Sequence, residues 1–137
     1  MTSLRLSPDA VMVLGLAGTA LPFAQSFDDE VERWLRPLRL YGRAGGALQS
    51  LGVSEGRLVE TEQSRPERSK DSPSETLHLV AAAASRIAAE RGGTTVGTFD
   101  VLHAVMGHYG EAFDYALRCR SCDSAELMTV LGERAAA

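Results

Sequence analysis

Aromatic residues are scarce in this chain: they make up 6% of its 137 residues, and only two cysteines are present. Two cysteines are too few for the disulfide framework that holds small secreted domains together. The 45% of hydrophobic residues can still form a core, because a domain of this length buries about two-thirds of the surface of its unfolded chain. We therefore expect one soluble, cytoplasmic domain over residues 1–137.

Lysine is nearly absent, with one residue beside 13 arginines, and the formal net charge is −4. A chain with this balance offers no positive face on which nucleic acid would bind. We interpret the excess of arginine as the codon usage of a GC-rich genome, and a cluster of arginines that reads phosphates is the alternative. Nucleic acid is therefore not an expected partner.

Long apolar runs and nucleotide motifs are also missing. The apolar stretch Val11–Leu21 is far shorter than the about 20 residues of a membrane-spanning helix. The opening M-T-S-L-R-L-S-P-D-A lacks the basic-then-apolar pattern of a secretory leader. No G-x-x-x-x-G-K-[ST] stretch occurs, which excludes a Walker-type nucleotide site. We expect neither a membrane partner nor a cofactor.

Helix signals dominate the first part of the chain. Ser7 followed by proline predicts a helix over residues 8–21, because serine caps a helix start and proline fits its first turn. Ser26 predicts a second helix with a capping box, and Pro37 is expected to break or kink it near Leu35. A third helix fits Arg43–Leu51, with Gly52 at its end.

The second part of the chain repeats this alternation after a polar stretch. Residues 54–73 read as a solvated linker, with a short helix near residues 56–62. A helix is then expected from Ser74 or Thr76 to Arg91, and Thr98 is expected to cap the next one. Two more fit residues 111–118 and 126–131. The expected fold class is all-α, with about seven or eight helices.

A Tyr-Gly pair occurs twice, at Tyr41 and again 68 residues later at Tyr109, each time before a short helix. The motif Ser26-Phe27-Asp28 likewise matches Thr98-Phe99-Asp100. One small repeat cannot bury its own apolar face, so two copies should pack together. We expect a pseudo-twofold helical bundle in which residues 5–53 and 74–131 are the two repeats, with a seam between them.

Three stretches resemble the N-terminal domain of Clp-type AAA+ unfoldases, which is a double repeat of small helical units. L-S-P-D-A-V-M-V-L-G-L-A is similar to the family's opening Phe-Thr-x-x-Ala-x-x-Val-Leu-x-x-Ala, and G-G-A-L-Q-S-L-G-V to its Leu-Gly-Val segment. V-G-T-F-D-V-L-H-A-V is similar to its Gly-Thr-Glu-His-Leu-Leu-x-Ala-Leu helix start. The resemblance implies a stand-alone, non-enzymatic module that binds a protein or peptide. It would act as an adaptor, regulator or decoy linked to Clp proteolysis.

The resemblance also implies where a peptide would bind. In some members the Glu of Gly-Thr-Glu helps to bind phosphorylated arginine, and this chain has Phe27 and Phe99 at the matching positions. Phenylalanine cannot pair with a guanidinium group, so Asp28 and Asp100 are the carboxylates that could replace the Glu. A serine stands where the family has a threonine beside that pocket. The predicted edges of the cleft are Ser7, Phe27 and Asp28 with Ser74, Phe99 and Asp100.

Other reactive residues are interpreted as structural. Cys119 and Cys122 form a C-x-x-C pair, for which packing is the favoured interpretation, with redox activity and zinc binding as alternatives. His103 and His108 would point about 140° apart on one helix, a poor arrangement for a shared metal. No metal site and no enzymatic activity are expected. The alternative to peptide binding is a structural protein that forms a homodimer or larger assembly through its own seam.

Overall fold

The computed structural model describes residues 5–52, 72–118 and 122–136, with the side chains of 132–136 left aside. Its described part contains seven α-helices, one 3-10 turn and two two-residue strands, which confirms the all-α class. In chain order the elements are β1 Arg5–Leu6, α1 Pro8–Ala20, η1 Leu21–Phe23, α2 Phe27–Leu40, α3 Gly42–Ser50, α4 Pro73–Glu90, β2 Thr95–Val96, α5 Thr98–Tyr109, α6 Glu111–Arg118 and α7 Ser124–Ala136.

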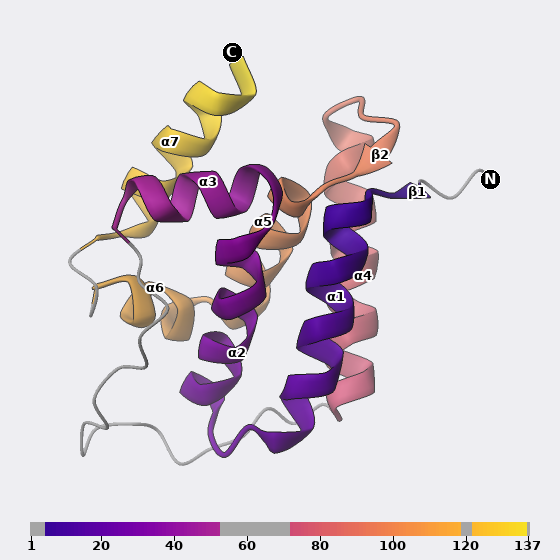
Figure 1. Ribbon diagram of the computed structural model, residues 1–137, viewed down its shortest axis with the longest axis vertical. Helices are drawn as coiled ribbons and strands as arrows, with labels where there is room; N and C mark the ends of the chain where they lie inside the picture. The colour runs from indigo at the N-terminus through magenta and orange to yellow at the C-terminus, as the bar shows by residue number, and fades with distance from the viewer. Residues whose placement is uncertain (1–4, 53–71, 119–121, 137) are drawn as a thin grey trace.

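Helices from the two ends of the chain are interleaved (Figure 1). α1 stands beside α4, and α5 packs against α4, α2 and α3. α3 also contacts α7, while α2 contacts α6. The strand β1 pairs in parallel with β2, so that the segment before α1 is tied to the segment before α5. We refer to residues 5–52 as the N-terminal half and to the described residues from Ser72 onward as the C-terminal half.

The long helices bury matching positions. On α1 and its following turn the buried residues Val13, Ala17 and Leu21 are spaced four apart, and Val80, Ala84 and Ala88 on α4 have the same spacing. Small side chains at this spacing form a narrow apolar stripe on one face of each helix. This stripe allows α1 and α4 to approach their neighbours closely. In chain order α2 follows α1 and α5 follows α4, and both α2 and α5 begin with a capped turn.

The start of α4 differs from the sequence expectation, which placed it at Ser74 or Thr76. Ser72 is the N-cap, because its Oγ accepts a hydrogen bond of 3.2 Å from the backbone N–H of Glu75. Ser7 caps α1 in the same way, with a bond of 3.1 Å from the N–H of Ala10. A proline follows both serines, so Ser-Pro is the start signal that the sequence carries twice.

Pro37 does not break α2 near Leu35, which was one of the two outcomes expected from the sequence. The helix continues to Leu40, and Pro37 is itself buried. Val31, Trp34 and Leu38 are fully buried along the same helix. Their burial helps to offset the roughly 3 kcal/mol that an internal proline costs, since Pro37 has no N–H to donate to the carbonyl of Arg33.

Several boundaries follow from capping groups. Gly97, not Thr98, is the N-cap of α5, and Thr98 is its first helical residue. α7 begins at Ser124, earlier than the expected residue 126, where the N–H of Glu126 donates to Asp123 Oδ1 over 2.8 Å. Helix α6 has the expected bounds. The predicted short helix at residues 56–62 lies outside the described residues.

Candidate functional site

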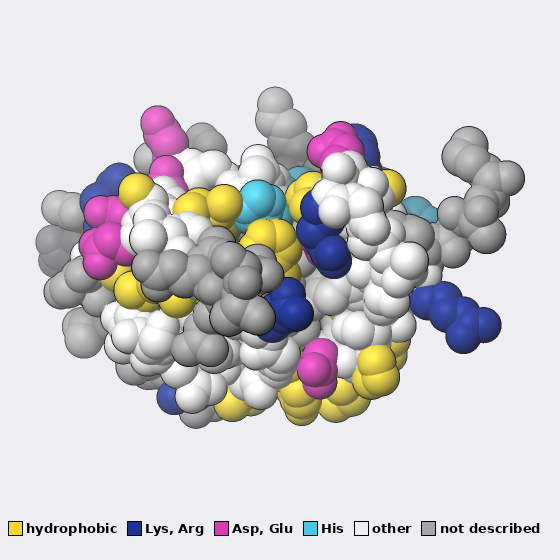
Figure 2. Space-filling view, turned by 90° about the horizontal axis from the view of Figure 1, so that it is seen from above, with side chains coloured by type: hydrophobic (Ala, Val, Ile, Leu, Met, Phe, Trp, Pro, Cys, Tyr) yellow, Lys and Arg dark blue, Asp and Glu magenta, His cyan; other side chains and the backbone are white. Residues whose placement is uncertain are grey.

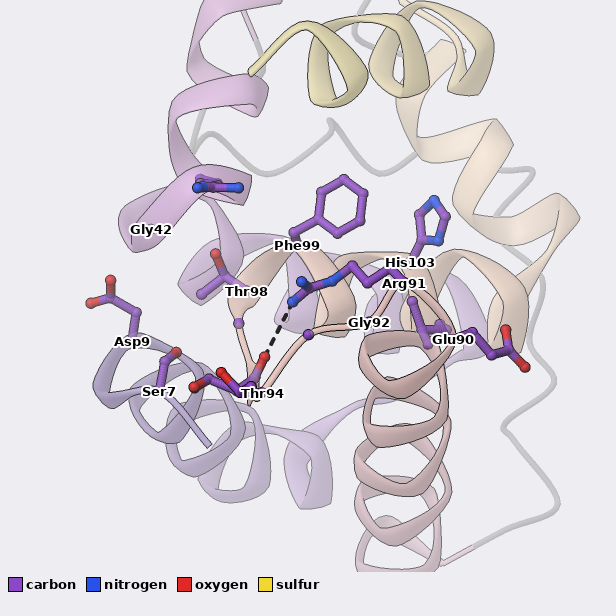
Figure 3. Close-up of a pocket in the computed structure, with 15 residues that line it drawn as sticks. Ser7, Asp9, Gly42, Glu90, Arg91, Gly92, Thr94, Thr98, Phe99 and His103 are labelled. Atoms are coloured by element: carbon purple, nitrogen blue, oxygen red, sulfur yellow. Dashed lines mark hydrogen bonds between the residues drawn. The ribbon is translucent and has the colours of Figure 1, made fainter. Parts of the chain in front are cut away.

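A pocket of about 1050 Å³ opens where the two halves meet, and we call it the junction pocket (Figure 3). The N-terminal half contributes the first residues of α1 and of α3 to its wall. The C-terminal half contributes the end of α4, the loop 92–97 and the start of α5. Helices far apart in the sequence therefore share one concave surface, and ligand sites in proteins commonly occupy such surfaces.

An aromatic shelf forms one wall of the junction pocket. The rings of Phe99 and His103 stack with their centroids 5.1 Å apart and an interplanar angle of 24° (Figure 3). Both side chains are half-buried, so each presents part of its ring to the pocket. His103 Nε2 also lies 3.0 Å from Met128 Sδ, on α7. The shelf offers a flat aromatic surface with one imidazole edge.

An ion pair between Arg91 and Asp100 lies at the floor of the junction pocket. Arg91 Nη2 lies 2.6 Å and Nε 2.8 Å from the two carboxylate oxygens of Asp100, and Nη2 also donates to the carbonyl of Thr95 over 3.1 Å. The N–H of Gly97 donates to Asp100 Oδ2 over 2.9 Å. Asp100 is fully buried, whereas the Arg91 side chain is 43% exposed. The bidentate bond to Asp100 raises the pKa of Arg91, and partial burial opposes this rise.

Three helices begin at the junction pocket: α1, α3 and α5. Thr98, from the C-terminal half, caps α3 of the N-terminal half, because its Oγ1 accepts the N–H of Ala44 over 3.2 Å. The side chain of Tyr41, the N-cap residue of α3, does not perform this role. Gly42 makes the approach possible, since its φ of 66° favours glycine and a Cβ atom there would overlap Thr98 Oγ1. The two halves therefore share a helix cap at this pocket.

The charges around the junction pocket are of mixed sign. Arg43 and Arg91 line it together with Asp9 and Glu90. The charge of Arg91 is already matched by Asp100. A rim with charges of both signs suits polar contacts to a peptide that carries few charges better than it suits a strongly charged ligand.

The structure brings only part of the predicted site together. Ser7 and Phe99 line the junction pocket, and Asp100 lies buried beneath it. Phe27, Asp28 and Ser74 are not among the residues of its wall. Ser74 lies near the start of α4, whereas the pocket is formed by the end of that helix, roughly 20 Å away along its axis.

The predicted correspondence between the two Phe-Asp motifs is shifted by one residue. Ser26 and Gly97 are the N-caps, so the aspartates at the third helical position are Asp29 and Asp100, not Asp28 and Asp100. Asp29 Oδ2 accepts the N–H of Gln25 over 3.0 Å, and it thereby holds the backbone before α2 as Asp100 holds the backbone before α5. This one-residue shift could not be predicted from the sequence, because the second N-cap is a glycine, which has no side chain to mark a helix start.

Phe27 contacts the second Tyr-Gly pair. Its ring packs on that of Tyr109, with centroids 5.0 Å apart. The hydroxyl of Tyr109 accepts a bond of 3.0 Å from Trp34 Nε1 and donates over 3.1 Å to Glu30 Oε1. Trp34 is fully buried and Tyr109 nearly so. Trp34 and Tyr109 belong to the core between the halves, and Phe27, a predicted edge of the peptide cleft, packs against this core and not on the wall of the junction pocket.

Arg91, Thr98 and His103 complete the site, and sequence reasoning gave them no role in it. The signal for Arg91 and Thr98 is the run R-G-G-T-T-V-G-T, in which a charged residue and a hydroxyl residue flank a glycine-rich loop, whereas His103 lies outside this run. The remaining candidates from the sequence are unconnected with it. Cys122 is buried and its Sγ lies 3.4 Å from the carbonyl oxygen of Leu117, while Cys119 lies outside the described residues. Within residues 5–52, 72–118 and 122–136, no three metal-ligating side chains gather.

Two comparisons with known proteins found no relative. A scan against protein-family models matched none of them. A search of the curated proteins likewise found no match. In the described part of the chain, each helix is too short or too polar to cross a membrane.

Proposed function

We propose that this protein is a non-enzymatic interaction module that binds an unstructured peptide segment in the junction pocket. The observation that carries the proposal is the half-buried Phe99, which stacks on His103 and faces the space between the two halves. Aromatic side chains in a concave site supply much of the binding energy of peptide recognition. The mixed rim, which includes Arg43 and Glu90, would hydrogen-bond the ligand's polar groups.

Three further features support this proposal over an active site. Asp100 is not free to act as an acid or base, since both of its oxygens are bonded to Arg91 or to a backbone N–H. The Oγ of Ser7 is engaged as a helix cap. The resemblance to the Clp N-terminal domain points in the same direction, and it suggests an adaptor, regulator or decoy of Clp proteolysis as the biological role.

Unmodified peptides are the expected ligands. The acidic group that would hold phosphoarginine in the related pocket is replaced by Phe99, and the neighbouring Asp100 is already paired. Peptides that carry phosphoarginine should therefore bind no tighter than the same peptides without it. A polypeptide with apolar and small polar side chains fits the aromatic shelf and the glycine-rich loop 92–97 best.

The test selects short unstructured peptides from a displayed library and measures their affinity by calorimetry. Phe99→Asp should weaken binding at least about tenfold, because it places a charge on the shelf. Phe23→Asp is the matched control: Phe23 is 70% exposed and lies outside the pocket, so its loss should leave affinity unchanged. Thr94→Trp, at an exposed pocket residue, should block the site without removing any core contact. Equal binding by all four proteins would refute the proposal.

A structural role as a homo-oligomer is the second candidate function. It is favoured by one separate observation, the exposed apolar face of α1, which does not border the core.

A further inference from the structure

α1 is apolar on its outer side as well as on its inner side. Its buried face consists of Ala10, Val13, Leu14 and Ala17. On the opposite side, Val11, Met12 and Leu16 keep 51%, 44% and 40% of their surface exposed. We call Val11, Met12, Gly15, Leu16 and Thr19 the α1 outer face, since at about 100° per residue these positions fall on one side of the helix.

No charged residue occurs between Asp9 and Asp28. A helix that is hydrophobic all round is normally covered on both sides, and a surface helix normally carries charges on its outer side. In Figure 2, hydrophobic side chains gather along the lower edge of the view. This edge is the side of the molecule on which α1 stands in front of α4 in Figure 1. Phe23, 70% exposed in the turn after α1, adds to the apolar surface. This surface therefore has the composition of an interface.

We propose that the α1 outer face is the contact between two copies of this chain in a twofold homodimer. An uncharged face matches itself, as the isologous interface of a twofold dimer requires. Gly15 lies near the middle of the helix, and a Cβ atom there would meet nothing within 4 Å. Two α1 helices can thus cross closely at Gly15, which sets Met12 and Leu16 of one copy beside Leu16 and Met12 of the other.

The size of the face predicts how strong this dimer is. The exposed parts of Val11, Met12 and Leu16 on this face, together with that of the neighbouring Phe23 in η1, amount to on the order of 400 Å² per copy. Stable complexes bury about 600 Å² or more per partner. The α1 dimer therefore falls below the size of a stable complex, and we expect weak, reversible association with a dissociation constant in the micromolar to millimolar range.

A membrane surface is a less suitable occupant. Helices that lie on membranes carry Lys or Arg on their polar side, which attract acidic headgroups. α1 has no basic residue between Pro8 and Ala20, and the whole chain has a net charge of −4. A second copy is the occupant that an uncharged, self-matching face fits.

The test is sedimentation of the full chain over a wide range of concentration. The average mass should rise from that of one chain towards that of two. Leu16→Glu should weaken association about tenfold or more, because each dimer would hold two opposed carboxylates. Leu79→Glu is the matched control and should leave association unchanged. Leu79 is 49% exposed on α4, and it lies about 200° around that helix from Leu77, the residue that contacts Gly18 of α1, so it points away from α1.

A cross-link provides a measurement that does not depend on Leu16→Glu folding. Under oxidation, Gly15→Cys should form covalent dimers well above the level of the unsubstituted protein, which has the same two native cysteines. A constant single-chain mass at the highest concentration would overturn the proposal. So would equal effects of the Leu16 and Leu79 substitutions, failure of the Gly15→Cys protein to cross-link, or binding of the chain to phospholipid vesicles through Leu16. Phe99→Asp should leave the dimer intact, so this test and that of peptide binding can fail separately.

Discussion

Gly42→Ala tests whether the shared helix cap holds the two halves together. Gly42 has a φ of 66°, and a Cβ atom there would overlap Oγ1 of Thr98. A left-handed conformation costs a residue other than glycine about 1–2 kcal/mol. Displacing Thr98 would also break its bond to the N–H of Ala44 inside the protein, at about 1–3 kcal/mol. We expect a total loss of about 3 kcal/mol in the free energy of unfolding.

Gly52→Ala separates the two contributions. Gly52 has a φ of 78°, but a Cβ atom there would meet nothing within 4 Å. Its substitution should therefore show the conformational cost alone, about 1–2 kcal/mol. The assay is urea unfolding followed by circular dichroism, supported by thermal melts in which about 3 kcal/mol corresponds to a shift of about 10 °C.

A double-mutant cycle identifies the residue that causes the difference. Thr98→Ala removes the hydroxyl and the methyl group that crowd Gly42, at a cost of about 1 kcal/mol for the lost cap. In that background Gly42→Ala should cost no more than Gly52→Ala does. If Gly42→Ala costs no more than Gly52→Ala in the unsubstituted protein, the close approach of Thr98 to Gly42 does not affect stability. The same conclusion follows if Thr98→Ala does not reduce the cost of Gly42→Ala.

Two further predictions concern the buried polar groups. Asp100→Asn should destabilise the protein by about 2 kcal/mol in urea unfolding, because the fully buried Asp100 carboxylate accepts short bonds from Arg91 and from the N–H of Gly97, whereas Asp29→Asn should cost less, since its bond to Arg33 is 3.4 Å long; equal losses would contradict this interpretation. Tyr109→Phe should cost about 2 kcal/mol, because the buried N–H of Trp34 loses its acceptor. Thermal melts that place Tyr109→Phe level with the unsubstituted protein would show that the hydroxyl does not matter.

The helices could be predicted from sequence because their signals are local. Ser7 and Ser26 mark two starts, and Gly52 marks the end of α3. Ser-Pro at Ser72 is an equally local signal, but two further candidates, Ser74 and Thr76, follow it within four residues. The expectation that Pro37 would break α2 was wrong because the rule against internal proline is local, whereas the burial of Trp34 that offsets it depends on the tertiary fold.

The site was only partly predictable because most of it is built from contacts between the halves. Phe99 is on the pocket wall as expected, but the role of Thr98 could not be read from its neighbours, since its partner is the N–H of Ala44. Periodicity gives the exposed side of a helix only when that side is polar. The α1 outer face is apolar, so its composition does not mark Leu16 as exposed; only the spacing of the buried residues Val13 and Ala17 leaves Leu16 on the outer side.

The two Tyr-Gly pairs acquire a common explanation in the contacts between the halves. Both glycines, Gly42 and Gly110, have a positive φ, so each pair turns the chain sharply between two helices. The start of α5 supplies Thr98 to the first turn, and the start of α2 supplies Phe27 to Tyr109 of the second. Each half thus supplies a side chain that contacts a turn of the other half, and the junction pocket lies at the first of these two contacts. A substitution that weakens this contact should therefore change both the shape of the pocket and the stability of the whole domain.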